Sequence, residues 1–180
     1  SKIYSIEPTD YAFLKMKKNF DINNELSKNL HPFQLFLGSD NQNLPISIHS
    51  SWNLKDNIKK HAKHFGVIKN TSNASIMTLD QFVENNNIDN LDFIKLDVDG
   101  YELDVLRGGE NFLKKNKPPI FMELAPYLYE EFGYKNEKLI NFLISFFYKF
   151  YYLNKIELIK DISFFSKNIK DGSSKNILVI

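Results

Sequence analysis

Short apolar runs that read as strands alternate with helix-like segments along this chain, and this order limits its fold more than any other feature. The clearest strand is predicted at residues 92–98, which are rich in β-forming residues and lead into the turn residue Gly100. A helix is predicted for residues 102–115, with a bend at Gly108 and Gly109, before a further strand at residues 120–124. Such alternation favours an α/β fold with a largely parallel sheet and helices on both faces.

The rest of the chain fits the same order within one domain of 180 residues. Thr78 and Gln81 have the spacing of a capping box and open a short helix. Residues 39–75 are rich in Asn, Ser, Gln and Lys, with a short alternating piece at 46–49, and are interpreted as an insertion that helps to shape a pocket. Further strands are predicted at 2–7, 33–37, within 152–160 and at 176–180, and further helices at 8–20 and 136–150.

Charge and cysteine content exclude several classes of function. The 23 basic and 22 acidic residues leave a net charge of +1, which disfavours a nucleic-acid binder. The chain has no cysteine, so disulfides and thiolate chemistry are ruled out. No targeting segment is visible, so we expect a cytoplasmic protein. The apolar residues 139–153 are too few and too interrupted for a membrane span, so we expect no integral membrane segment. The oligomeric state is left open.

Acidic residues stand where three of the predicted strands end. They are Glu7, the pair Asp97 and Asp99, and Glu123. In open α/β sheets, ligands bind at the carboxyl ends of the strands, so these positions are the first candidates for a site. Glu7 could accept both hydroxyls of a ribose, or it could simply stabilise the start of the next helix through the helix dipole. The sequence leaves both roles open.

Three carboxylates lie close together in sequence around Gly100. Asp97, Asp99 and Glu102 could raise one another's pKa, bind a cation or supply a general base. Lys95, Asp97 and Asp99 would share one face if the strand continued that far. The alternative is structural: Asp99 would belong to a turn and Glu102 to the first turn of a helix. We favour function, because three acids exceed what a turn requires.

The run Asp-Val-Asp-Gly at residues 97–100 resembles two enzyme signatures only weakly. It is similar to the haloacid dehalogenase phosphatases, in which Asp97 would be the nucleophile and Asp99 its partner. Tyr101 replaces the expected Thr, however, and no later acidic pair is present for magnesium. The Asp-x-Asp pattern also resembles the metal site of nucleotide-sugar glycosyltransferases, but the flanking elements do not support that class.

A third resemblance covers much more of the chain, because several segments occur in the expected order. They are Ile-Glu-Pro at 6–8, Thr-Leu-Asp-Gln-Phe at 78–82, Asp-Phe-Ile-Lys-Leu-Asp-Val-Asp-Gly-Tyr-Glu at 92–102, Val-Leu-Arg-Gly-Gly at 105–109 and Pro-Ile-Phe-Met-Glu-Leu at 119–124. Together they resemble the FkbM-type family of S-adenosylmethionine-dependent methyltransferases. The likeness runs from residue 2 to about residue 124.

This resemblance implies a Rossmann-like class I methyltransferase sheet, S-adenosylmethionine as cofactor and a hydroxyl acceptor on a sugar, glycan or secondary metabolite. Glu7 would then hold the ribose diol, and Leu37, Gly38 and Ser39 would lie near the adenine. Asp97 would stand at the junction of cofactor and acceptor.

The resemblance also implies direct displacement of the methyl group, which requires a base for the acceptor proton. Asp97 is the first candidate for this base, and Asp99 or Glu102 is the second. Asp99 stands where the family more often has Glu, whose side chain is longer by one methylene group. The implied mechanism requires no metal.

The start of the chain departs from the family pattern. In the family a strand and a glycine-rich turn precede the Glu7 strand, whereas only six residues precede Glu7 here. We therefore expect the first βα unit to be missing, the sheet to lack its central strand and the chain to be part of a longer protein. An alternative function is a non-catalytic Rossmann-like module that binds a ligand without the cofactor loop.

The histidines add weaker candidates. His49 could act as a base or bind the acceptor, with Trp52 stacking on a sugar, but a solvated loop position fits it better. His61 and His64 are three residues apart and could share a metal, yet no third ligand lies near them in the sequence. We therefore expect no metal site.

Overall fold

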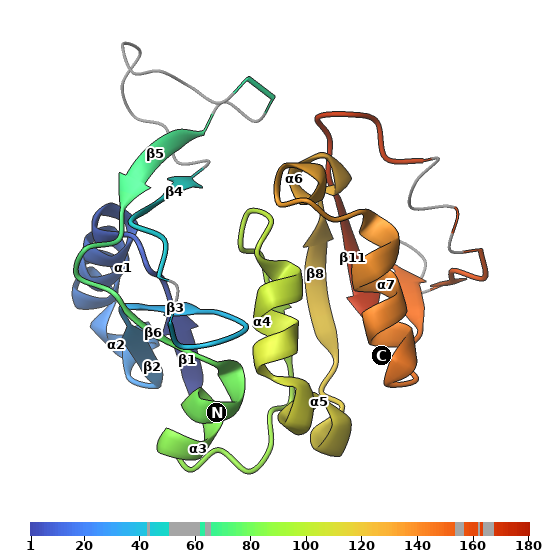
Figure 1. Ribbon diagram of the computed structural model, residues 1–180. Helices are drawn as coiled ribbons and strands as arrows, with labels where there is room; N and C mark the ends of the chain where they lie inside the picture. The colour runs from blue at the N-terminus through green and yellow to red at the C-terminus, as the bar shows by residue number, and fades with distance from the viewer. Residues whose placement is uncertain (43, 51–61, 64–65, 154–156, 162, 164–167) are drawn as a thin grey trace. The chain divides into compact units, whose positions relative to one another are not determined.

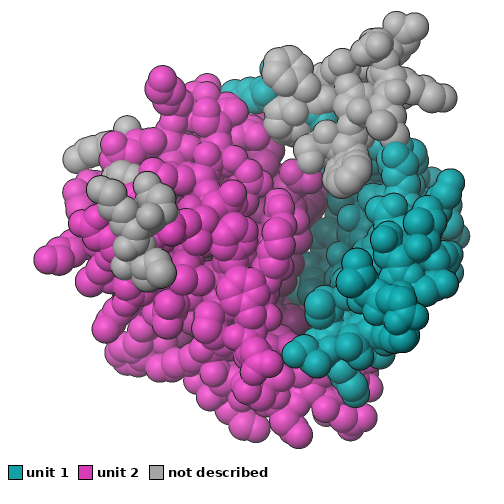
Figure 2. All heavy atoms as spheres, turned by 180° about the vertical axis from the view of Figure 1, so that it is seen from behind, with its two compact units in different colours: residues 1–78 teal, residues 79–180 magenta. Residues whose placement is uncertain are grey.

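The alternation of strands and helices expected from the sequence is present in a computed structural model of the chain (Figure 1). The structure describes residues 1–42, 44–50, 62–63, 66–153, 157–161, 163 and 168–180. These residues form two compact units, Ser1–Thr78 and Leu79–Ile180, which are teal and magenta in Figure 2. Each unit has its own strands and helices.

The first unit contains three two-stranded sheets. Strand β1 pairs in parallel with β2, β3 pairs in parallel with β6, and β4 pairs antiparallel with β5. Its elements are β1 (Ile3–Ile6), α1 (Asp10–Ile22), α2 (Asn24–Ser27), β2 (Leu30–Phe33), β3 (Leu35–Leu37), β4 (Ser47–Ser50), β5 (Val67–Asn70) and β6 (Ser75–Met77).

One predicted strand is divided in this unit, and three elements, α2, β5 and β6, were not predicted. Residues 33–37 were expected as a single strand, but β2 and β3 are separated at Gln34. The side chain of Gln34 donates a hydrogen bond to Asp10 Oδ1 at 2.6 Å, and Asp10 also accepts bonds from Ser72 and Asn73. Within the expected insertion, β4 confirms the short strand predicted at 46–49, and its partner β5 was not predicted.

The second unit is built on a five-stranded sheet with the order β10-β9-β11-β8-β7. Strands β7 and β8 are parallel, and the other neighbours in this sheet are antiparallel. Its elements are α3 (Leu79–Asn85), β7 (Ile94–Leu96), α4 (Glu102–Gly108), α5 (Glu110–Asn116), β8 (Ile120–Leu124), α6 (Pro126–Glu131), α7 (Asn136–Ser145), β9 (Phe150–Tyr152), β10 (Glu157–Leu158) and β11 (Lys175–Val179).

One face of this sheet carries the core of the second unit. Alternate side chains of β8 are fully buried, and Ile177 and Val179 of β11 share their face. Since side chains alternate along a strand, this pattern places one apolar face inward. Buried leucines and isoleucines of the helices complete the core: Leu103, Leu106, Leu113, Leu139, Ile140 and Leu143.

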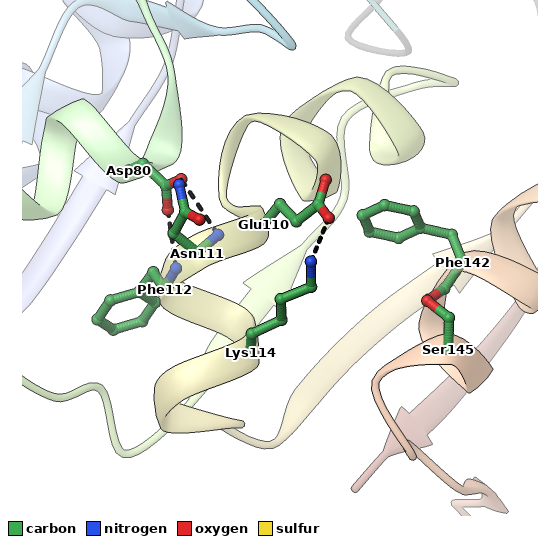
Figure 3. Close-up of polar contacts among 7 residues, drawn as sticks. All are labelled: Asp80, Glu110, Asn111, Phe112, Lys114, Phe142 and Ser145. Carbon is green, nitrogen blue, oxygen red and sulfur yellow. Dashed lines mark hydrogen bonds and ion pairs between the residues drawn. The ribbon is translucent and has the colours of Figure 1, made fainter.

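The predicted bend at the paired glycines is confirmed as a break between two short helices. Helix α4 ends at Gly108 and α5 begins at Glu110. A Cβ atom on Gly109 would lie 2.5 Å from Leu79 Cδ2, so the residue between the helices must be small. Asp80 then caps the second helix, because its carboxylate accepts the backbone N–H groups of Asn111 and Phe112 (Figure 3).

One expectation for the fold is confirmed only in part, and another needs correction. The mixed α/β class is confirmed, but the described strands form four sheets, and the single, largely parallel Rossmann-like sheet is not seen. Strands β1 and β7 belong to different sheets. The helix predicted for 136–150 ends at Ser145, because Phe147 takes a positive φ of 64° and the chain then enters β9.

Candidate functional site

Glu7 lies directly after β1, as the sequence predicted. Its backbone N–H donates to Phe33 O at 3.1 Å, which extends the pairing of β1 with β2. Its carboxylate Oε1 accepts two hydrogen bonds from Thr9, from the backbone N–H at 2.8 Å and from the hydroxyl at 2.5 Å. Both hydrogen bonds from Thr9 are accepted by Oε1. The other carboxylate oxygen, Oε2, can therefore accept a hydrogen bond from a ligand.

Thr9 is the residue near Glu7 that the sequence interpretation missed. It is 1% exposed and is the N-cap of α1, where its hydroxyl also accepts the N–H of Ala12 at 3.4 Å. The helix therefore starts two residues later than the Pro8 that marked its predicted start. The sequence signal for this helix start was a threonine, a preferred N-cap residue, followed directly by Asp10. Thr9 fixes the orientation of the Glu7 carboxylate.

Leu37, Gly38 and Ser39 follow the course expected for a turn after a strand. Leu37 ends β3 and is half-buried, Gly38 is buried, and Ser39 is exposed. Gly38 N–H donates to Met77 O at 3.0 Å, and a Cβ atom there would lie 3.0 Å from Asp40 O. The turn thus has room only for glycine without a shift of its backbone. Its contact with adenine stays a prediction.

In the second unit, the acids at the ends of β7 and β8 lie at the same level of the sheet. The parallel register pairs Lys95 with Phe121 and Leu96 with Met122, where the pairing ends, and Asp97 and Glu123 are the next residues of the two segments. Asp97 Oδ2 lies 2.6 Å from Lys95 Nζ, in an ion pair whose side chains are 46% and 59% exposed. An exposed pair of this kind contributes little stability, so Asp97 can exchange Lys95 for another partner.

Asp99 does not share the face of Lys95 and Asp97. Strand β7 ends at Leu96, and Asp99 has a left-handed backbone with φ of 49°. This placement agrees with the alternative assignment of Asp99 to a turn. Its negative charge still bears on the site, because it helps to raise the pKa of Tyr127 and of Glu102.

Glu102 begins α4 and is 1% exposed. Its Oε1 accepts the backbone N–H groups of Val98 at 3.4 Å and Gly100 at 3.5 Å. The pKa of Glu102 is raised to about 7, chiefly by burial and to a smaller extent by the charge of Asp99, against the lowering effect of the nearby backbone N–H groups. The carboxyl group therefore changes protonation near neutral pH.

Tyr127 is a second residue that sequence interpretation missed. It lies on α6, a helix that was not predicted, and its side chain is 8% exposed. Burial raises the pKa of Tyr127, and the charges of Glu123 and Asp99 raise it further. The phenol consequently stays protonated near neutral pH. Pro126 at the first helical position was the available signal for α6.

Three findings concern the remaining predictions. The described part of the chain holds no cluster of three or more His, Asp or Glu side chains that could bind a metal ion. In the same part, none of the helices is long and apolar enough to cross a bilayer. His49 lies on β4, opposite Ile68, whereas Trp52, His61 and His64 are outside the described residues.

The three acidic strand ends are thus distributed over two units. Asp97 follows β7 and Glu123 lies on the neighbouring strand β8, both in the second unit, and Glu7 lies in the first. A joint cofactor site formed by Glu7 and Asp97 therefore stays a prediction.

Comparisons with known proteins agree with this arrangement of elements. The family model of the methyltransferase FkbM domain matches residues 1–152. A solved structure, that of the methyltransferase FkbM from Methylobacillus flagellatus KT, is similar to this chain. The TM-score is 0.57, the sequence identity is 12%, and the match covers 99% of the present chain. The match covers 36% of the solved chain, so the sequence spans about a third of that protein's length. A comparison with curated proteins gives no match.

Proposed function

This chain belongs to the methyltransferase FkbM family, and from that premise we propose that it carries the catalytic part of an S-adenosylmethionine-dependent O-methyltransferase. The acceptor is a hydroxyl group on a sugar, glycan or secondary metabolite. The observation that carries the proposal in the second unit is the exposed carboxylate of Asp97 at the end of β7, level with Glu123 on β8.

The residues of the first unit fit part of this cofactor. Glu7 has one carboxylate oxygen held by Thr9, which leaves Oε2 to accept hydrogen bonds from a ribose diol. Gly38 allows the chain to turn tightly after β3, and the exposed Ser39 follows it. Glu7, Leu37, Gly38 and Ser39 would hold the nucleoside. When bound, S-adenosylmethionine supplies a methyl group that carries the positive character of its sulfonium.

Asp97 is the proposed base. Transfer of a methyl group to a hydroxyl oxygen releases the hydroxyl proton, and a carboxylate within hydrogen-bond reach accepts that proton. Asp97 is exposed, and its present partner Lys95 is an exposed ammonium group that can move aside.

Asp97→Asn tests this assignment in a transfer assay with S-adenosylmethionine that carries a labelled methyl group. We expect the turnover number with a panel of sugar and glycan acceptors to fall by roughly 100- to 10,000-fold, the range for loss of a general base. Asp92→Asn, an exposed acid just before β7, is the matched control and should keep full activity. Equal activity of both variants would contradict the role of Asp97.

Cofactor binding is measured separately by calorimetry. Glu7→Gln should weaken S-adenosylmethionine binding by roughly 10- to 100-fold, because hydrogen bonds to a charged group contribute about 1.5 to 3 kcal/mol. Glu25→Gln, which removes the charge of an exposed carboxylate paired with Lys28, should not change it. Binding without transfer would instead favour a non-catalytic module. Magnesium-dependent hydrolysis of a phosphate ester, lost in Asp97→Asn, would favour a phosphatase.

A further inference from the structure

The chain reverses direction sharply between Asp97 and α4. Two consecutive residues, Asp99 and Gly100, have positive φ angles of 49° and 104°. The second value favours glycine, and a Cβ atom on Gly100 would also lie 2.5 Å from Cε2 of Phe132. Asp97 and Asp99 therefore stand on a turn whose shape is set by few residues and tolerates little change. We call residues 97–100 the acidic turn.

Backbone N–H groups of the acidic turn point to one buried carboxyl group. Glu102 Oε1 accepts from Val98 N–H at 3.4 Å and from Gly100 N–H at 3.5 Å. Successive N–H groups in a turn of this kind form a concave site for an anion. Here the chain fills that site with its own side chain. The second oxygen, Oε2, is buried and has no hydrogen-bond partner among the described residues.

The other side of the acidic turn is held by the segment that follows α6. The hydroxyl of Tyr134 donates to Gly100 O at 2.9 Å. The ring of Phe132 packs edge-on against Tyr101, with ring centroids 4.5 Å apart. Gly100 is thus fixed through its N–H by Glu102 and through its carbonyl by Tyr134. A displacement of either partner would move the turn that carries Asp97.

Burial makes Glu102 a poor candidate for direct proton transfer. A base must come within hydrogen-bond reach of the hydroxyl that it deprotonates. Glu102 is 1% exposed, whereas Asp97 is exposed at the end of its strand. The oxygen of Glu102 that contacts the chain is occupied by the acidic turn itself.

We propose that Glu102 is a positioning residue whose carboxyl group shapes the acidic turn and thereby places Asp97 for catalysis. The shaping role stands on the contacts of Glu102 alone, and the catalytic consequence rests on the proposed function. Two acidic residues only five positions apart in the sequence thus have different roles. Asp97 would accept the proton, and Glu102 would hold the backbone that presents it.

Two substitutions separate positioning from proton transfer. Glu102→Gln keeps an oxygen acceptor for Val98 and Gly100, and Glu102→Ala removes it. We expect amide hydrogen exchange at Val98 and Gly100, followed by NMR, to accelerate about 3- to 10-fold in Glu102→Ala and to stay near the wild-type rate in Glu102→Gln. Exchange at these two amides that is unchanged in Glu102→Ala would overturn the proposal.

Turnover is the second measurement. Displacement of a catalytic group by about 1 Å reduces the rate by roughly 100-fold, so kcat should fall by 10- to 100-fold in Glu102→Ala, with KM for the acceptor nearly unchanged. Glu102→Gln should restore most of kcat. If Glu102→Gln were instead as inactive as Glu102→Ala while its amides stayed protected, Glu102 would be the base, and the positioning role would be wrong.

A third measurement uses the charge of Glu102 and does not depend on transfer. The titratable groups that face it are Asp99 on the acidic turn, Tyr129 on α6 and Tyr134 after α6. Burial raises the pKa of both tyrosines, so they stay neutral near neutral pH. The amide shifts of Val98 and Gly100 should then titrate with a midpoint near the Glu102 pKa of about 7 and lose this titration in Glu102→Gln. An identical titration in Glu102→Gln would refute the assignment.

Controls keep the test decisive if Glu102→Ala fails to fold. Tyr134→Phe removes only the hydroxyl that holds Gly100 O, and we expect a smaller acceleration of exchange at the same two amides. Glu110→Gln removes an exposed carboxylate that pairs with Lys114 on α5, and it should leave both amides and kcat unchanged. If the wild type showed no methyl transfer but the exchange rates of the two amides changed as expected in the variants, the proposed function would be wrong. The shaping role of Glu102 would still hold. Unchanged exchange rates of the two amides in Tyr134→Phe would contradict the role of Tyr134 in holding the acidic turn.

Discussion

The buried carboxyl group of Glu102 makes the stability of this protein depend on pH in a defined direction. Its pKa is raised from 4.5 to about 7 in the folded chain, chiefly by burial. Between these values the folded state binds more protons than the unfolded state, so stability is greatest below the unfolded pKa and declines as pH rises to about 7. Across this pH range the rise in the pKa corresponds to a loss of unfolding free energy on the order of 3 kcal/mol.

Glu102→Gln removes this titration and preserves the shape of the side chain. Urea unfolding followed by circular dichroism gives the free energy at about pH 5 and about pH 8. We expect the wild type to lose roughly 2 to 3 kcal/mol more than the variant between these two values. The contributions of the other titrating groups to the unfolding free energy cancel in this comparison, because both proteins contain these groups. Parallel losses in the two proteins would refute the burial of a titrating carboxyl group at this position.

Two further predictions concern the helix starts. Asp80→Ala removes the acceptor at the start of α5 and should lower the unfolding free energy by about 1 kcal/mol in the same urea assay, with a smaller loss in Asp80→Asn. Thr9→Val removes the hydroxyl that caps α1 and orients Glu7, so it should lower the unfolding free energy by about 1 kcal/mol. Calorimetry should also show S-adenosylmethionine binding weakened about 3- to 10-fold in Thr9→Val, and unchanged affinity would contradict the orienting role.

Proline and glycine residues at the ends of elements gave the clearest of the correct predictions. Residues 120–124 follow two prolines and form β8, and the paired glycines separate α4 from α5. Each signal acts through the backbone, because proline and glycine restrict or extend the accessible φ angles. Such effects hold whatever the surrounding tertiary structure. Elements of this kind can therefore be located before any packing is known.

The end of α7 had no comparable signal. Phe147 N–H donates to Ile144 O, Tyr148 N–H donates to Leu143 O, and Phe147 has the positive φ that glycine usually supplies. A Schellman ending with phenylalanine at this position carries no mark in the sequence. The apolar run from residue 139 therefore read as one longer helix. Local hydrogen bonds and the sheet position of β9 decide the boundary instead.

The acids of the candidate site show why residue identity alone could not assign their roles. The sequence placed Asp97, Asp99 and Glu102 at one strand end and left each of them as a possible base. In the structure, Asp97 is exposed beside Lys95, Asp99 lies on the left-handed turn, and Glu102 is buried. Environment sets the pKa and the reach of a carboxyl group, so three similar side chains acquire three different capacities. Because burial of an acid is rare and depends on distant segments such as that around Tyr134, no local pattern could have predicted it.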